Sequence, residues 1–119
     1  MATVTLFGIP NCDTVKRART WLTEQGVTHG FHDFKKAGVP AEHLAAWVAT
    51  HGWEVVLNRK GTAWRGLDDA AKAAVVDAYS AQAAMRATPS VIKRPVVEWA
   101  DGSITIGFDA DDWTRRTRT

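Results

Sequence analysis

The stretch TVTLFGIPNCDTVKRARTWLTEQG, residues 3–26, predicts a strand, a tight turn and a helix in succession. Residues 3–7 alternate in character and are rich in β-branched and aromatic side chains, and a Gly/Pro turn follows them. Over residues 13–25 the apolar side chains recur at three- and four-residue spacings, and Gly26 is placed to end the helix. Cys12 therefore stands between a strand and a helix.

The region after this helix predicts a second strand and then helices. VTHGFHDF, residues 27–34, has the composition of a strand, and KKAGVP, residues 35–40, that of a turn. Pro40 suits the first position of a helix that ends near His51. WEVVLN, residues 53–58, fits a strand or a short helix equally.

The remainder of the chain predicts a long helix, a hairpin and a short terminal helix. Asp68 or Asp69 is placed to cap one alanine-rich helix that continues to about Ala87. Residues 95–108 contain a D-G pair between two β-rich runs, which is a strong signal for a β-hairpin. Asp109 is placed to cap the last helix.

The order of these elements predicts an α/β fold. A crossover helix makes the first two strands parallel, and the hairpin adds two antiparallel strands, so we expect a four-stranded mixed sheet. This is the order of a thioredoxin-like fold with a helical insertion at about residues 40–86, between strands 2 and 3. A chain of 119 residues has the length of one domain, which we expect to span residues 1–119 as a monomer.

Composition excludes several classes of protein. Apolar residues make up 45% and charged residues 24%, as in ordinary globular proteins, and no apolar run approaches the ~18 residues that cross a membrane. The net charge is only +2, and much of the excess lies in the tail RRTRT, residues 115–119, so we expect a solvated basic tail rather than a nucleic-acid-binding face. The start of the chain shows no secretory leader, so we expect a cytoplasmic protein without membrane contact.

Cys12 is the only cysteine, so it cannot form an internal disulfide. Unpaired N–H groups and the partial positive charge at a helix N-terminus favour a thiolate. Lys16 lies one helical turn further on the same face and adds positive charge, whereas Asp13 opposes it. The alternative is a small buried apolar residue, which unpaired cysteine frequently is.

The chemistry of a reactive Cys12 needs a second thiol from outside. Val15 occupies the place of the second cysteine of a redox CxxC motif, so the sequence predicts a monothiol site. Any oxidised form of Cys12 has to be reduced by an external thiol, and glutathione is the obvious candidate in the cytosol.

Two basic motifs are candidates for binding an anion. Arg94 precedes Pro95 in IKRPVV, and its guanidinium can hold an oxyanion or a carboxylate, or else face solvent where the strand begins. Pro95 opens a strand where thioredoxin folds place a proline beside the active thiol, and the sequence leaves its cis or trans state open. Arg59 and Lys60 lie in a basic turn within LNRKGTAWRGL. The four histidines lack the spacing of a metal site, so we expect neither a metal nor a nucleotide.

Four motifs together resemble the arsenate-reductase-like family of thioredoxin folds, in which the YffB-type glutathione-dependent thiol reductases form the most similar branch and the regulator Spx is more distant. The resemblance extends to about Phe108. The motifs are FGIPNCDTVKRA (7–18), FHDFKKAG (31–38), LNRKGTAWRGL (57–67) and PSVIKRPVV (89–97).

The resemblance implies roles for particular residues. Cys12 matches the catalytic cysteine of the family, and Arg94 matches an arginine that stabilises the oxyanion or thiolate. Arg59 matches a second substrate arginine, for which Lys60 is a competing match. Where arsenate reductases carry a further arginine near the end of the hairpin, this chain has Gly107, which argues against arsenate as the substrate.

The sequence therefore predicts a monothiol, glutathione-dependent reductase with Cys12 and Arg94 as catalytic residues. The expected substrate-binding residues are Asn11, Lys16, Arg59, Lys60 and Pro95. Glutathione is the expected co-substrate, acting with a small oxidised or oxyanion substrate, and glutaredoxin is a candidate partner. The alternatives are a non-catalytic Spx-like regulator, which the absence of a CxxC motif weakens, and a glutathione-binding module without chemistry.

Overall fold

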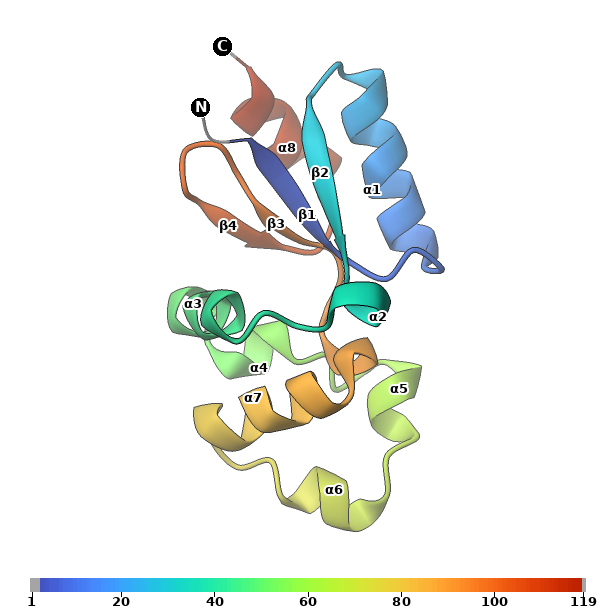
Figure 1. Cartoon of the computed structure of the whole chain (residues 1–119), viewed down its shortest axis with the longest axis vertical. Helices are drawn as coiled ribbons and strands as arrows, with labels where there is room; N and C mark the ends of the chain where they lie inside the picture. The colour runs from blue at the N-terminus through green and yellow to red at the C-terminus, as the bar shows by residue number, and fades with distance from the viewer. Residues whose placement is uncertain (1–2, 119) are drawn as a thin grey trace. The chain divides into compact units, whose positions relative to one another are not determined.

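A computed structural model describes residues 3–118 of the chain, which form two compact units (Figure 1). One unit combines residues 3–33 with 94–118, and the other comprises residues 34–93. The single domain that we expect from the sequence stays a prediction. No helix within residues 3–118 is long and apolar enough to cross a membrane.

The first unit contains the sheet, and its topology confirms the predicted α/β fold. The strand order is β2-β1-β3-β4, with β1 and β2 parallel and the other two pairs antiparallel. Helix α1 connects the parallel strands, as a crossover requires. The elements of this unit are β1 (Val4–Gly8), α1 (Asp13–Glu24), β2 (His29–Asp33), β3 (Val96–Glu98), β4 (Ile104–Ile106) and α8 (Ala110–Thr117).

One face of the sheet is covered by α1 and α8. Leu6 of β1 and Val97 of β3 are direct neighbours in the sheet, and both are fully buried. The aromatic rings of Trp21 on α1 and Trp113 on α8 meet edge to face at 5.8 Å, so the two helices contact each other over this face. The main core of this unit consists of Val4, Leu6, Val15, Ala18, Leu22, Val97, Trp99 and Trp113.

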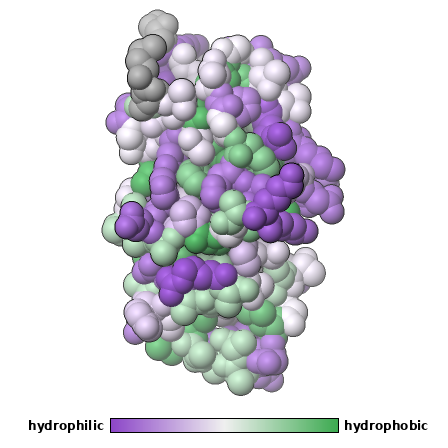
Figure 2. Space-filling view, viewed as in Figure 1, coloured by the Kyte–Doolittle hydropathy of each residue, from purple (hydrophilic) through white to green (hydrophobic). Residues whose placement is uncertain are grey.

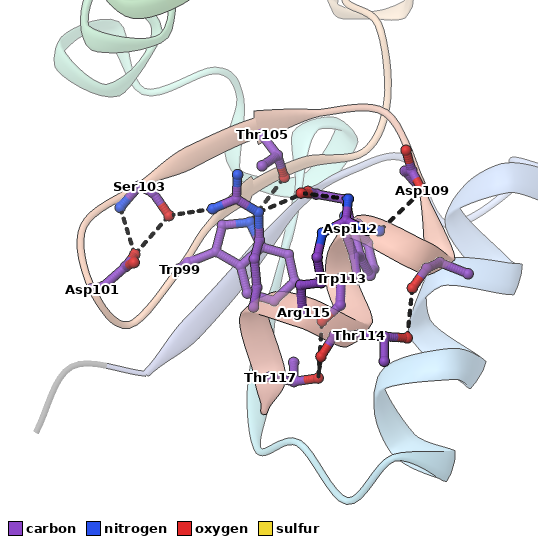
Figure 3. Close-up of polar contacts among 12 residues, drawn as sticks. Trp99, Asp101, Ser103, Thr105, Asp109, Asp112, Trp113, Thr114, Arg115 and Thr117 are labelled. Atoms are coloured by element: carbon purple, nitrogen blue, oxygen red, sulfur yellow. Dashed lines mark hydrogen bonds and ion pairs between the residues drawn. The ribbon is translucent and has the colours of Figure 1, made fainter. Parts of the chain in front are cut away.

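A polar network ties α8 to the β3–β4 hairpin (Figure 3). Arg116 donates from Nε to Asp112 Oδ2 at 2.7 Å and from Nη1 to Ser103 Oγ at 2.9 Å. The Ser103 hydroxyl in turn donates to Asp101 Oδ1 at 2.6 Å in the hairpin turn. Residues 115–117 of the predicted solvated tail belong to α8, where Arg115 and Arg116 remain exposed; Thr119 lies outside the described residues.

The second unit is helical and confirms an insertion between the second and third strands. Its apolar centre includes Phe34 and Trp47, whose rings lie 6.2 Å apart, and Leu57 bridges to Ile92 in an antiparallel pair. Its elements are α2 (Phe34–Ala37), α3 (Ala41–His51), α4 (Trp53–Val56), α5 (Thr62–Arg65), α6 (Asp69–Ala73), α7 (Ala78–Ala87) and the 3-10 turn η1 (Pro89–Val91).

Two predictions for this unit were wrong. The expected turn at residues 35–40 begins with the short helix α2, because Phe34 is buried and the backbone turns only at Gly38, where φ is +73°. The expected single long helix is divided into α6 and α7. Asp77 starts a new helix by accepting a hydrogen bond from Ser80 N–H at 2.9 Å, and the Ser80 hydroxyl accepts one from Asp77 N–H at 3.0 Å. This capping box satisfies the backbone groups at the break, which favours two helices over one.

The helix ends confirm two predicted caps and correct the predicted start of α3. Asp68 caps α6 and Asp109 caps α8 through backbone N–H groups three residues further on. Pro40 is the residue before α3 rather than its first helical residue. The ambiguous stretch 53–58 forms the short helix α4.

Candidate functional site

Cys12 is the residue that precedes α1. Its backbone is extended, with φ −147° and ψ 122°, and its carbonyl accepts the first intrahelical hydrogen bond, from Lys16 N–H at 2.9 Å. The first-turn N–H groups before Lys16 have no acceptor within the helix by the geometry of an α-helix. Within residues 3–118 the Cys12 side chain makes no capping hydrogen bond to these groups. A ligand or thiolate at Cys12 therefore faces the positive end of α1.

The environment of Cys12 is mixed rather than fully apolar. The side chain packs against the main core and is partly buried. Asp13 in the first turn opposes negative charge there, whereas Lys16 is exposed one turn further along. Cys12 is therefore a free cysteine that lies partly buried at the edge of the core, and its reactivity stays a prediction.

Gly8 at the end of β1 brings Arg94 close to the first turn of α1. A Cβ built on Gly8 would lie 3.0 Å from Cγ2 of Val15 and 3.9 Å from Cβ of Arg94. Val15 is fully buried and stands one turn into the helix that Cys12 caps. Arg94 therefore starts from the same corner of the unit as the thiol, where β1 ends and α1 begins.

The Arg94–Pro95 peptide bond is cis, which settles the isomer that the sequence left open. Pro95 is buried, and its carbonyl accepts a hydrogen bond from Gly107 N–H at 2.8 Å. Gly107 has φ +90°, a conformation that L-amino acids with side chains rarely adopt. The positive φ of residue 107 thus favours glycine over arginine at this position of the chain.

Arg59 and Lys60 belong to the helical unit, at a turn with its own small cavity. Arg59 Nη2 lies 3.2 Å from Glu54 Oε2, and its guanidinium lies 5.3 Å from the centre of the Trp53 ring. Lys60 N–H donates to Asn58 Oδ1 at 3.2 Å. The cavity, of about 290 Å³, is lined by Glu54, Val55, Leu57, Asn58, Arg59, Lys60 and Lys93.

The structure distributes the predicted site residues over the two units. Cys12, Lys16, Arg94 and Pro95, with the exposed Asn11, belong to the sheet unit. That the basic turn with Arg59 and Lys60 serves the same ligand as Cys12 stays a prediction.

Lys93 is a cation that sequence reasoning passed over as a mere neighbour of Arg94. It lines the cavity beside Arg59 and Lys60, and its backbone N–H donates to Val56 O at 2.8 Å. The sequence offered only its position beside Arg94, because the pairing of Ile92 with Leu57 that places it here is a tertiary contact. Within residues 3–118 no group of three or more His, Cys, Asp or Glu side chains could hold a metal ion.

Comparison with known proteins gives one consistent result. The model of the ArsC family matches residues 7–115. An uncharacterised protein of Haemophilus influenzae is 36% identical over 110 residues, which cover 92% of this chain and 95% of that protein. A solved YffB protein is 48% identical with a TM-score of 0.91, and covers 98% of this chain and 100% of its own. An arsenate-reductase-related protein from Brucella melitensis is 44% identical with a TM-score of 0.73, covering 98% and 96%.

Proposed function

This chain belongs to the ArsC family, and from that premise we propose that it is a monothiol reductase in which Cys12 is the nucleophile and glutathione the reductant. The observation that carries the proposal is the place of Cys12. The thiol is free and partly buried at the N-terminus of a twelve-residue helix, with Arg94 beginning at the same corner. The arsenate-reductase-related protein from Brucella melitensis, at 44% identity, supports thiol chemistry of this kind.

The proposed reaction is three successive thiol–disulfide exchanges. The Cys12 thiolate attacks one sulfur of a disulfide substrate, the new S–S bond forms as the old one breaks, and the other sulfur leaves with the electron pair as a thiolate. A glutathione thiolate then attacks the Cys12 sulfur of this mixed disulfide, which releases the second substrate sulfur as a thiolate and leaves Cys12 bonded to glutathione. A second glutathione thiolate attacks the glutathione sulfur of that bond, which forms oxidised glutathione and releases Cys12 as a thiolate. The substrate is reduced and two glutathione molecules are oxidised to one disulfide.

The chain's own residues have separate roles in this scheme. The first-turn N–H groups of α1 and the charge of Lys16 stabilise the thiolate of Cys12. Arg94 binds the developing negative charge on the leaving sulfur or a substrate oxyanion. Pro95 and Asn11 flank the bound sulfur. Arg59 or Lys60 binds a carboxylate of glutathione.

Val15 supports the need for an external thiol. It occupies the position of the second cysteine in a CxxC motif, and it is fully buried against Gly8. A side chain at this place faces the core, so the helix offers no nearby group to resolve a mixed disulfide. Because Gly107 replaces an arginine of arsenate reductases, we propose disulfides rather than arsenate as the substrate class.

The proposal is tested by a glutathione-coupled assay, in which glutathione reductase consumes NADPH as oxidised glutathione forms. The wild type, Cys12→Ser and Arg94→Gln are compared on mixed disulfides and on arsenate, with and without glutaredoxin. We expect turnover of mixed disulfides that Cys12→Ser abolishes and Arg94→Gln lowers by about tenfold or more. Arg86→Gln, at an exposed position on α7, is the matched control for loss of one arginine.

Three results would contradict the proposal. Activity of Cys12→Ser equal to that of the wild type would exclude Cys12 as the nucleophile. Glutathione binding without turnover of any substrate would support a binding module instead, and partner capture without turnover would support a regulator.

A further inference from the structure

A polar groove runs along α1 on the side of β2, beginning one helical turn beyond Cys12. It has a volume of about 540 Å³ and is lined by Lys16, Arg19, Thr20, Thr23, Glu24 and His29. Figure 2 shows hydrophilic side chains gathered over α1, in the orientation of Figure 1. Of these residues, the proposed reaction uses only Lys16. The rest of the groove therefore has no role in that reaction.

The groove presents hydrogen-bond donors and positive charge along most of its length. Lys16 and Arg19 supply two cations, and Thr20 and Thr23 supply hydroxyl groups on the same face of the helix. The guanidinium of Arg19 lies 4.2 Å from the centre of the Phe31 ring on β2, a cation–π contact that orients it. A preordered cation loses less entropy when it binds a carboxylate.

The far end of the groove has a different character. Glu24 lies there with His29, whose ring Nδ1 is 2.8 Å from Val27 O. The Nδ1–H donates to this carbonyl, which leaves Nε2 to accept or donate toward a ligand. The charge order along the groove is therefore positive near Cys12 and mixed at the end of α1.

We infer that the groove binds the polypeptide that flanks the reacting cysteine of a protein substrate, and that it selects acidic residues close to that cysteine. The inference rests on the proposed function, since it names the substrate of that same thiol. From Lys16 to Glu24 the helix rises by about 12 Å, which an extended segment of about four residues spans. A chain bonded through its cysteine to Cys12 is already tethered one turn from Lys16. Its acidic side chains then face Lys16 and Arg19 and are kept away from Glu24.

The test uses short peptides whose cysteine carries 5-thio-2-nitrobenzoate in a disulfide. Cys12 thiolate attacks the peptide sulfur, the peptide–nitrobenzoate S–S bond breaks, and thionitrobenzoate leaves as a coloured thiolate, so its release reports the rate. Three peptides carry two aspartates, two serines or two lysines within four residues of the cysteine. At low salt we expect the wild type to react with the acidic peptide several-fold faster than with the serine peptide, and slowest with the lysine peptide.

Two arginines of α1 provide the matched variants. Arg19 lines the groove, whereas Arg17 is exposed and does not line it, and both lose one charge on substitution by glutamine. We expect Arg19→Gln to lower the acidic-over-serine rate ratio by about two- to fivefold, which is the range of a single surface ion pair, and Arg17→Gln to leave it within experimental error.

The outcomes separate this inference from the proposed function. Equal rates for the acidic and serine peptides would contradict peptide binding in the groove, and so would equal losses of the acidic-over-serine rate ratio in Arg17→Gln and Arg19→Gln. Either result would leave Cys12 a reactive thiol. If no peptide released thionitrobenzoate, both the proposed reactivity of Cys12 and the inferred peptide site would be contradicted. A larger loss with the acidic peptide than with the serine peptide in Arg19→Gln, and no such difference in Arg17→Gln, would establish the groove as the peptide site.

Discussion

Gly8 and Val15 are in close contact where the first strand meets the first helix, since a Cβ on residue 8 would stand 3.0 Å from Val15 Cγ2. Val15 is held in the main core, so it has little room to move away. The contact fixes the distance between the end of β1 and the first turn of α1. The place of Cys12, which lies between them, depends on this distance.

Replacing Gly8 by alanine tests this relationship. We expect Gly8→Ala to lower the free energy of unfolding by about 1–3 kcal/mol, because the added methyl overpacks a buried contact. Val15 has to give way to the methyl group, and because Val15 lies in the first turn of α1, we expect the rate of Cys12 alkylation by iodoacetamide to change as well. Urea unfolding and alkylation kinetics measure the two effects.

Gly30→Ala is the control for this change. A Cβ on Gly30, in β2, has no heavy atom within 4 Å, so stability and Cys12 reactivity should stay near the wild-type values. If both alanine variants behave alike, the Gly8–Val15 contact does not position the helix.

Substitutions at residue 107 test why this chain has a glycine where arsenate reductases carry an arginine. Gly107 has φ +90°, so Gly107→Arg should lower the free energy of unfolding by about 1–3 kcal/mol and confer no arsenate reduction. Gly107→Asn should cost less, because asparagine tolerates positive φ better than most residues. Thermal unfolding and an arsenate assay are the measurements. A stable Gly107→Arg variant with arsenate turnover would show that the glycine is not required by the backbone.

The ion pair of Arg116 and Asp112 predicts a measurable coupling in α8. The two side chains are about 30% exposed and meet at 2.7 Å, so a double-mutant cycle with Arg116→Gln and Asp112→Asn should give about 0.2–1 kcal/mol. Arg115 lies 3.8 Å from the same carboxylate and is 68% exposed. A cycle with Arg115→Gln should therefore give a smaller coupling, and the reverse order would contradict the network in Figure 3.

Asp101 predicts a pH effect at the hairpin turn. Hydrogen bonds from the Ser103 side chain, then from the Ser103 backbone N–H, hold the pKa of the Asp101 carboxyl below its ordinary value of 3.8. A lowered pKa in the folded state means that this contribution to stability is present above the unfolded pKa and is lost as the pH falls through the folded one. In Ser103→Ala the Asp101 pKa should rise toward 3.8 in an NMR titration. An unchanged pKa would exclude the hydroxyl as the main cause.

Local sequence patterns determined the elements that carry the chemistry. Alternation predicted β1, a 3.6-residue period with a terminal glycine predicted α1, and the D-G pair predicted the β3–β4 hairpin, because each of these signals depends on residues close in the chain. The same patterns placed Cys12 before the helix without any tertiary information. The ArsC family resemblance was read from ordered motifs and agrees with the family match.

Other features depended on local chemistry that the patterns did not separate. Alanine favours helix throughout residues 69–87, so composition indicated one helix, yet the Asp77–Ser80 capping box divides it. The hydrogen bond from Arg116 to Ser103 was likewise not predictable from a local pattern, since the two residues are thirteen apart in the chain.

By itself, the sequence determined a strand–helix–strand unit with one thiol at the helix start and no second thiol to resolve it, because these depend on residue identity and short-range spacing. Only the tertiary structure decided that Gly8 brings Arg94 and Val15 to the same corner, that the Arg94–Pro95 bond is cis, and that Arg19 and His29 share a groove. Gly8 and Arg94 are distant in the chain, and the other relations depend on the packing of strands and helices, which no local pattern encodes.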